Sequence, residues 1–175
     1  MKRKIAILGA GESGVGAALL AKQKEFDVFV SDAGFIKKAF KDELILNGID
    51  FEEGGNSREK ILNASLIIKS PGIPEKNEMV KEIREKGIEI ISEIEFAYWY
   101  KGDSKIIGIT GSNGKTTTTA LTYHICKAGD LDCAMVGNIG FSFARQVAVD
   151  PKKLYVVEIS SFQLDDIKDF RPNVA

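Results

Sequence analysis

Lys115 and Thr116 lie near the end of a glycine-containing loop, and their side chains suit the binding of a nucleoside triphosphate. The loop is Gly111-Ser112-Asn113-Gly114-Lys115-Thr116-Thr117, and it follows a short β-branched run at 105–110. Glycines let the backbone approach a polyphosphate, and a helix beginning at about Lys115 adds the positive end of its dipole. The Lys115 ammonium would neutralise the β and γ phosphates, and the Thr116 hydroxyl would ligate Mg2+. The stretch therefore predicts a nucleoside triphosphate site.

This loop is a variant of the usual P-loop. The usual pattern has a glycine where Ile109 stands, and the glycines here are at 108 and 111. Threonine is a poor helix former, so the four threonines at 116–119 are expected to serve as caps or ligands. The alternative is an ordinary glycine-rich turn, but Gly-Lys-Thr directly after a β run is hard to obtain by chance.

Two further polar sites follow predicted strands. Glu158 stands near the end of the apolar run 154–159, and a carboxylate there supplies the hard oxygen that Mg2+ needs beside a phosphate loop. Asn138 lies in Gly137-Asn138-Ile139-Gly140, where flanking glycines let the chain reach a ligand and the amide can bond it. A structural carboxylate and a simple turn are equally good interpretations of these two features.

The N-terminal part has its own glycine-rich turn. An apolar run at 4–8 leads into Gly9-Ala10-Gly11-Glu12-Ser13-Gly14, and Asp32 ends the next apolar run. This is the layout of a Rossmann-like unit, in which an acidic residue at that point bonds a ribose or base. Ser70-Pro71-Gly72-Ile73-Pro74 forms a rigid loop at the edge where parallel sheets bind ligands. Structural turns with a surface aspartate are the alternative.

Strands and helices alternate along the chain, which predicts an α/β fold with parallel sheets. The segment 92–100 is amphipathic, with apolar residues interleaved with Glu93 and Glu95, and we interpret it as a connection between domains. We therefore expect a Rossmann-like domain at 1–94 and the first part of a P-loop-type α/β domain at 95–175. The expected strands are 4–8, 27–31, 49–51, 65–69, 88–91, 105–110, 132–136 and 154–159, and the expected helices are those ending at about 24 and spanning 35–47, 57–63, 75–86 and 116–128.

Composition excludes several classes of protein. The 24 basic and 25 acidic residues give a net charge of −1, which argues against nucleic acid and anionic membrane as partners. The N-terminal apolar run is broken by glycines and by Glu12, so it predicts neither a signal peptide nor membrane insertion. Cys126 and Cys133 fit no common zinc spacing and are expected to be buried reduced thiols of a cytoplasmic protein.

Three stretches together closely resemble the Mur ligases. They are Gly-Ser-Asn-Gly-Lys-Thr-Thr at 111–117, Gly-Asn-Ile-Gly at 137–140 and Glu-Ile-Ser-Ser-Phe-Gln-Leu at 158–164. Ser-Pro-Gly-Ile at 70–73 and the first glycine-rich turn extend the resemblance over nearly all of the chain, in the family's order. The Ser-Ser-Phe-Gln-Leu and Ser-Pro-Gly pieces favour the members that add D-glutamate over those that add alanine, diaminopimelate or lysine.

The resemblance implies a cytoplasmic enzyme of peptidoglycan synthesis that uses ATP and Mg2+. The substrates would be UDP-N-acetylmuramoyl-L-alanine, activated as an acyl phosphate, and D-glutamate, whose amine attacks it. By this resemblance 111–117 binds ATP, with Lys115 on its phosphates, and Thr116 and Glu158 serve Mg2+. The diphosphate would meet Glu12, Ser13 and Gly14, the uridine would meet Asp32, Ser70, Pro71 and Gly72, and the muramoyl part would meet Asn138, Ser160 and Gln163.

The family's carbamylated lysine, a further metal-ligating histidine and a C-terminal domain would lie beyond residue 175. We therefore expect this chain to bind the UDP-sugar without ligating, and an exposed sheet edge would favour self-association. Two alternatives stay open. One is an NAD-type oxidoreductase, which depends on the glycine-rich turn and Asp32, and the other is a nucleotide-sugar module that binds without catalysis.

Overall fold

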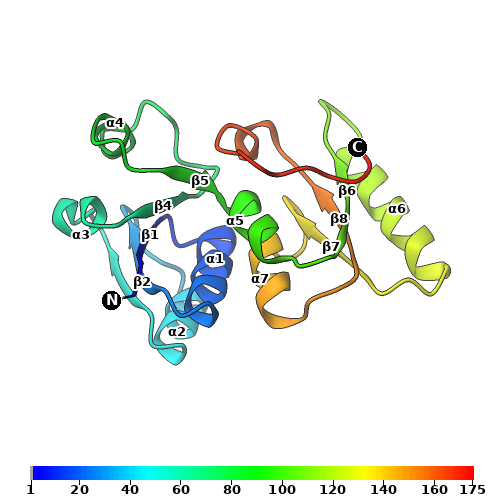
Figure 1. Cartoon of the computed structure of the whole chain (residues 1–175), viewed down its shortest axis with the longest axis horizontal. Coiled ribbons are helices and arrows are strands. Elements are labelled where there is room, and N and C mark those ends of the chain that lie inside the picture. The colour runs from blue at the N-terminus through cyan, green and yellow to red at the C-terminus, as the bar shows by residue number, and fades with distance from the viewer. Residues whose placement is uncertain (1) are drawn as a thin grey trace.

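The computed structural model describes residues 2–175 and contains two parallel sheets that lie side by side (Figure 1). The first has the strand order β3-β2-β1-β4-β5 and the second the order β6-β8-β7. Neighbouring strands in both sheets run parallel. Helices α1, α5 and α7 lie between the sheets and contact one another (Figure 1). The predicted α/β fold with parallel sheets is confirmed.

The elements lie close to their expected positions. The first sheet contains β1 (Lys4–Leu8), β2 (Asp27–Asp32), β3 (Asp50–Glu53), β4 (Leu66–Lys69) and β5 (Ile90–Ser92), connected by α1 (Glu12–Gln23), α2 (Lys38–Leu46), α3 (Arg58–Leu62) and α4 (Glu78–Glu85). Helix α5 (Glu93–Tyr100) leads to the second sheet, with β6 (Lys105–Ile109), α6 (Lys115–Ala128), β7 (Cys133–Gly137), α7 (Phe143–Val149), β8 (Leu154–Glu158) and a 3-10 turn, Ser161–Gln163.

The central strands are apolar because helices cover both faces of each sheet. All four residues of β4 and the last four of β8 are buried. One continuous hydrophobic cluster joins Ile5 and Leu66 of the first sheet to Phe143 and Tyr155 of the second half. Full burial of a large apolar side chain contributes about 1.5–3 kcal/mol. The two sheets are therefore held together by a shared core.

The interpretation of the segment 92–100 as amphipathic is wrong, because α5 buries its acidic as well as its apolar residues. Glu93 and Glu95 are buried together with their apolar neighbours, because the helix lies between the two sheets. Backbone N–H donors compensate this burial: Ala144 donates to Glu93, and three consecutive residues, 168–170, donate to Glu95. The expected domain boundary after residue 94 falls inside this helix, so the division into 1–94 and 95–175 stays a proposal.

Helix α7 was not among the expected elements. Ser142 caps its first turn by accepting a hydrogen bond from the Arg145 N–H at 3.2 Å. The helix packs so closely on α1 that a Cβ added to Gly16 would lie 1.9 Å from the Ser142 hydroxyl. Glycine at position 16 thus permits the contact between the two halves of the chain.

The two cysteines behave as expected from their spacing. Cys126 and Cys133 are free and buried, and they belong to a small apolar cluster with Val156 beneath α6. Burial raises the pKa of the Cys133 thiol. Among the described residues 2–175, no helix has the length and hydrophobicity needed to cross a bilayer.

Candidate functional site

The predicted phosphate loop lies at the carboxyl end of β6 and leads directly into α6. Gly111 has φ 142° and Gly114 has φ 76°, backbone conformations that strain residues with a side chain. Gly114 is the N-cap of α6, and its carbonyl accepts the first bond of the helix, from Thr118 N–H at 2.9 Å. Residues 111–114 are exposed, so an anion can reach the N–H groups at the start of this 14-residue helix.

Lys115 and the threonines after it take different positions. The Lys115 ammonium donates to the Gly111 carbonyl at 2.6 Å, which folds the side chain back over the loop it would serve. Thr116 is exposed, as are the next two threonines. Thr119 is buried, and its hydroxyl donates to the Lys115 carbonyl at 2.8 Å. The expectation of a cap or ligand is therefore wrong for Thr119, which bonds back to the preceding turn.

Glu158 ends β8, which lies between β6 and β7. It pairs in register with Ile109 on one side and Gly137 on the other. Its side chain is 1% exposed, and one carboxylate oxygen accepts from the Asn138 amide at 2.8 Å. The other oxygen has no hydrogen-bond partner among residues 2–175. An unpartnered buried carboxylate oxygen is costly unless a cation or water satisfies it. Such an oxygen beside a phosphate loop fits a Mg2+ ligand.

The three residues expected to face the muramoyl part lie at the same carboxyl edge. Asn138 is exposed, and its backbone N–H donates to the Glu158 carbonyl at 2.9 Å. Ser160 and Gln163 form a capping box, in which the Gln163 side-chain oxygen accepts from the Ser160 N–H at 2.9 Å. Gln163 is buried, so its side chain supports the turn that presents Ser160.

The first glycine-rich turn is built around Asp32. One Asp32 carboxylate oxygen accepts from the Ala10 N–H at 2.7 Å, and the other accepts from the Gly34 N–H at 2.8 Å. Gly9 has φ 90°, and a Cβ on Gly14 would lie 1.9 Å from the Gly9 carbonyl oxygen. This close approach packs the start of α1 against the end of β1, as the glycine spacing predicts.

Two cavities flank Asp32 at the carboxyl edge of the first sheet. A cavity of about 130 Å³ lies between the glycine-rich turn and Ile73, which follows the Ser70-Pro71-Gly72 loop. A second, of about 280 Å³, lies at the start of α1 beside Gly11 and Glu12. Ser70 donates to the Gly9 carbonyl at 3.5 Å, so its loop lies against the turn. The structure thus brings the expected uridine and diphosphate residues together.

The Glu12 side chain has other partners. It accepts from the Ser142 N–H at 3.0 Å and from Arg145 at 2.7 Å, both at the start of α7. Arg145 also pairs with Glu43 of α2. If Glu12 and Ser13 contact a diphosphate, they would therefore do so through their backbone N–H groups at the start of α1. Sequence reasoning missed Arg145, because its partners lie more than a hundred residues away and no local pattern marks it.

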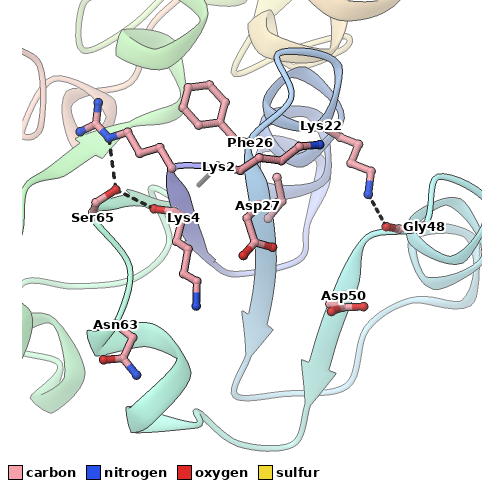
Figure 2. Close-up of a pocket in the computed structure, with 11 residues that line it drawn as sticks. Lys2, Lys4, Lys22, Phe26, Asp27, Gly48, Asp50, Asn63 and Ser65 are labelled. Atoms are coloured by element: carbon pink, nitrogen blue, oxygen red, sulfur yellow. Dashed lines mark hydrogen bonds between the residues drawn. The ribbon is translucent and has the colours of Figure 1, made fainter.

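A larger hollow, of about 660 Å³, lies at the opposite edge of the first sheet (Figure 2). Lys4, Asp27 and Asp50 line it at the amino ends of β1, β2 and β3. Its charges are mixed, and Lys22 is already bonded to the Gly48 carbonyl at 2.6 Å. None of the residues predicted to bind a ligand lines this hollow.

Known proteins resemble the chain in both halves. Residues 4–79 match the model of the MurD N-terminal domain, and residues 109–175 match that of the Mur ligase middle domain. A UDP-N-acetylmuramoylalanine–D-glutamate ligase from Cytophaga hutchinsonii is 58% identical, over 100% of this chain and 39% of the relative. The ligase of the same name from Bacteroides thetaiotaomicron is 54% identical, over 99% and 39%. The chain thus spans well under half the length of these relatives.

Solved structures share the fold. A murein peptide ligase from Psychrobacter arcticus superposes with a TM-score of 0.64 at 20% identity, over 97% of this chain and 41% of that one. A type C pseudomurein peptide ligase from Methanothermus fervidus superposes with a TM-score of 0.55 at 29% identity, over 90% and 33%.

The fold and the site first assign the chain to a structural class of proteins. The class is that of parallel α/β proteins in which glycine-rich turns link a strand to a helix, here once in each sheet. Within this class, the two matching domain models and the relatives with more than 50% sequence identity identify one family. The chain belongs to the Mur ligase family.

Proposed function

We propose that this chain is the part of a cell-wall ligase that binds UDP-N-acetylmuramoyl-L-alanine and ATP, and that the whole enzyme adds D-glutamate to that substrate. The observation that carries the proposal is the unpartnered, buried oxygen of Glu158, which lies beside the phosphate loop. The names of the relatives support the choice of D-glutamate. The whole enzyme would work in the cytoplasm, where ATP and the nucleotide sugar are made.

In the proposed nucleotide site, a small number of groups would bind the phosphates and the metal ion. Phosphoryl transfer depends mainly on positioning and charge neutralisation, so no protein nucleophile is required. The loop N–H groups at 111–114 would orient the phosphates, and the Lys115 ammonium would leave the Gly111 carbonyl to neutralise them. Thr116 and Glu158 would hold Mg2+, which supplies charge stabilisation to the transferring phosphoryl group.

The UDP-substrate would lie along the carboxyl edges of both sheets. Its uridine would occupy the cavity between Asp32 and Ile73, next to the Ser70-Pro71-Gly72 loop, and its diphosphate would meet the N–H groups of 12–14. Its muramoyl part would reach Asn138 and Ser160, close to the phosphates of ATP. The L-alanyl carboxylate would then accept the γ-phosphoryl group, and the D-glutamate amine would displace phosphate from that acyl phosphate.

A lysine exchange in the whole enzyme tests this function. Lys115→Ala removes a positioned charge from the transferring phosphates, so kcat/KM for D-glutamate-dependent phosphate release should fall by the equivalent of about 3 kcal/mol or more. Lys127→Ala is the matched control, because Lys127 is exposed in the last turn of the same helix and should tolerate the change. Near-normal turnover of Lys115→Ala would contradict the assignment.

A further inference from the structure

Lys69 and Asp166 form a buried ion pair between the two halves of the chain. Their charged atoms are 3.0 Å apart, and the two side chains are 4% and 3% exposed. Lys69 is the last residue of β4, and Asp166 lies after the 3-10 turn that follows β8. Removing two charges from water is unfavourable, so a pair this deeply buried needs further partners.

Those partners complete a ring of four charged side chains. The Lys69 ammonium also lies 3.1 Å from Glu75, and Arg84 lies 2.6 Å from Asp166. Arg84 and Glu75 pair at 2.9 Å, which closes the ring. In addition, Lys69 donates to the Ile73 carbonyl at 3.2 Å. Each of these partners of Lys69 therefore lies either in the loop after β4 or in the segment after β8.

Both ends of the pair adjoin loops that the proposed function assigns to the UDP-substrate. Lys69 directly precedes Ser70-Pro71-Gly72, and its bond to Ile73 spans that loop. Ile73 lines the cavity beside Asp32. Asp166 follows Gln163, whose side chain supports Ser160, by three positions. The pair therefore connects the uridine side of the site to the muramoyl side.

We propose that Lys69 and Asp166 are positioning residues that fix the distance between these two loops, so that one UDP-sugar can contact both. The inference rests on the proposed function for the identity of the ligand. It adds two residues that touch no substrate but set where the substrate-facing loops lie.

Attachment of the 166–170 segment alone does not call for this pair. Glu95 already accepts three backbone N–H bonds from 168–170, and the Ser92 N–H donates to the Asp166 carbonyl at 2.9 Å. A buried ion pair is weak evidence for a contribution to stability, because two apolar side chains of similar size often stabilise the fold equally or more. What the ring adds is a fixed direction and spacing for the two loops.

Asp166→Asn is the first test, measured by calorimetric titration of this chain. The variant keeps the side chain's size and removes the charge that holds Lys69. UMP contacts the first loop only, so its Kd should stay within a factor of about two. UDP-N-acetylmuramoyl-L-alanine must reach both loops, so its Kd should rise by about tenfold or more, as expected when a distant change displaces a contact group.

Lys69→Met and Lys69→Arg form a second pair of variants. The methionine loses the bond to Ile73 as well as the ion pair, so the affinities for UMP and for the UDP-sugar should both fall. The arginine keeps the charge, and it should restore UMP binding to within a few-fold of the unchanged chain. Glu89→Gln is the matched control, because its pair with Lys168 also joins the two halves but lies at the surface, at 3.3 Å. This control should bind both compounds normally.

The outcomes separate the inference from the function on which it rests. If the unchanged chain fails to bind the UDP-sugar, the proposed function is wrong. If it binds and Asp166→Asn weakens UMP and the UDP-sugar equally, or neither, the positioning role is wrong. A thermal melt of each variant accompanies the titrations, since loss of fold would weaken all ligands together, Mg-ATP included, and would also count against a specific positioning role.

Discussion

In the described part of the chain, two buried carboxylates each retain one oxygen without a hydrogen-bond partner, and their surroundings give them different properties. Glu158 ends a strand beside the proposed phosphate loop, where a cation could satisfy the free oxygen. Glu93 lies at the junction of α5 and α7, accepts from the Ala144 N–H and has Glu12 as a nearby like charge. Burial, reinforced by Glu12, raises the pKa of Glu93 from 4.5 to about 7.

The raised pKa predicts how stability depends on pH. The folded state holds the Glu93 proton more tightly than the unfolded state, so the associated stability is present below about pH 4.5 and is lost as the pH rises through 7. Glu93→Gln keeps an acceptor for Ala144 and never ionises. At pH 8 its free energy of unfolding should exceed that of the unchanged chain by on the order of 1–3 kcal/mol.

Denaturant titrations at pH 5.5 and pH 8 measure this difference. The advantage of Glu93→Gln should be largest at pH 8 and smaller at pH 5.5, because only part of the stability linked to the Glu93 proton has been lost at pH 5.5. Glu89→Gln, at a half-buried site on the surface, controls for the general loss of one negative charge. An equal effect of Glu93→Gln at both pH values would contradict the assigned ionisation.

At the scale of elements, the first glycine-rich turn offers a paired prediction. Gly14→Ala places a methyl group 1.9 Å from the Gly9 carbonyl, which must move and separate α1 from β1. Overpacking of this kind should lower the free energy of unfolding by about 1–3 kcal/mol and weaken UMP binding. In Gly11→Ala the new Cβ meets no atom of residues 2–175 within 4 Å, so the thermal midpoint of this variant should stay nearly unchanged. Equal destabilisation of the two variants would show that the packing argument is wrong.

Strands, most helices and both glycine-rich turns could be predicted because their signals are local. Apolar runs and glycine spacing carry them, and the strands at 4–8 and 154–158 appear where the pattern indicates. The burial of Glu95 could not be predicted, because its compensating donors come from 168–170, more than seventy residues away. Helix α7 has a recognisable cap in Ser142, a local signal that sequence reasoning passed over.

Some of the expected site residues could likewise be placed from local sequence signals, and others could not. Lys115, Thr116 and Glu158 follow from strand-end positions that any parallel sheet brings to one edge. Glu12 does not, because its side chain is bonded by Arg145 from the other half of the chain. Long-range ion pairs leave no periodic trace in the sequence, which is also why Lys69 and Asp166 went unpredicted.

At the scale of the whole molecule, the shared core predicts one cooperative unfolding transition. The same apolar cluster contains residues of both sheets, and α1, α5 and α7 pack against one another between them. Trp99, the single tryptophan, lies on α5 and packs edge-on against Phe96, so its fluorescence reports on this junction. Denaturant curves followed by Trp99 fluorescence and by far-ultraviolet circular dichroism should coincide. Separate midpoints would mean that the halves unfold independently.

We propose that the carboxyl edges of the two sheets form a site for a UDP-sugar. A calorimetric titration of this chain with UDP-N-acetylmuramoyl-L-alanine, with NAD in a parallel cell, tests this directly. We predict saturable one-to-one binding of the UDP-sugar and no heat beyond dilution from NAD. If NAD bound and the UDP-sugar did not, the account of the turn around Asp32 would be contradicted, and the site would be that of a dinucleotide-binding protein.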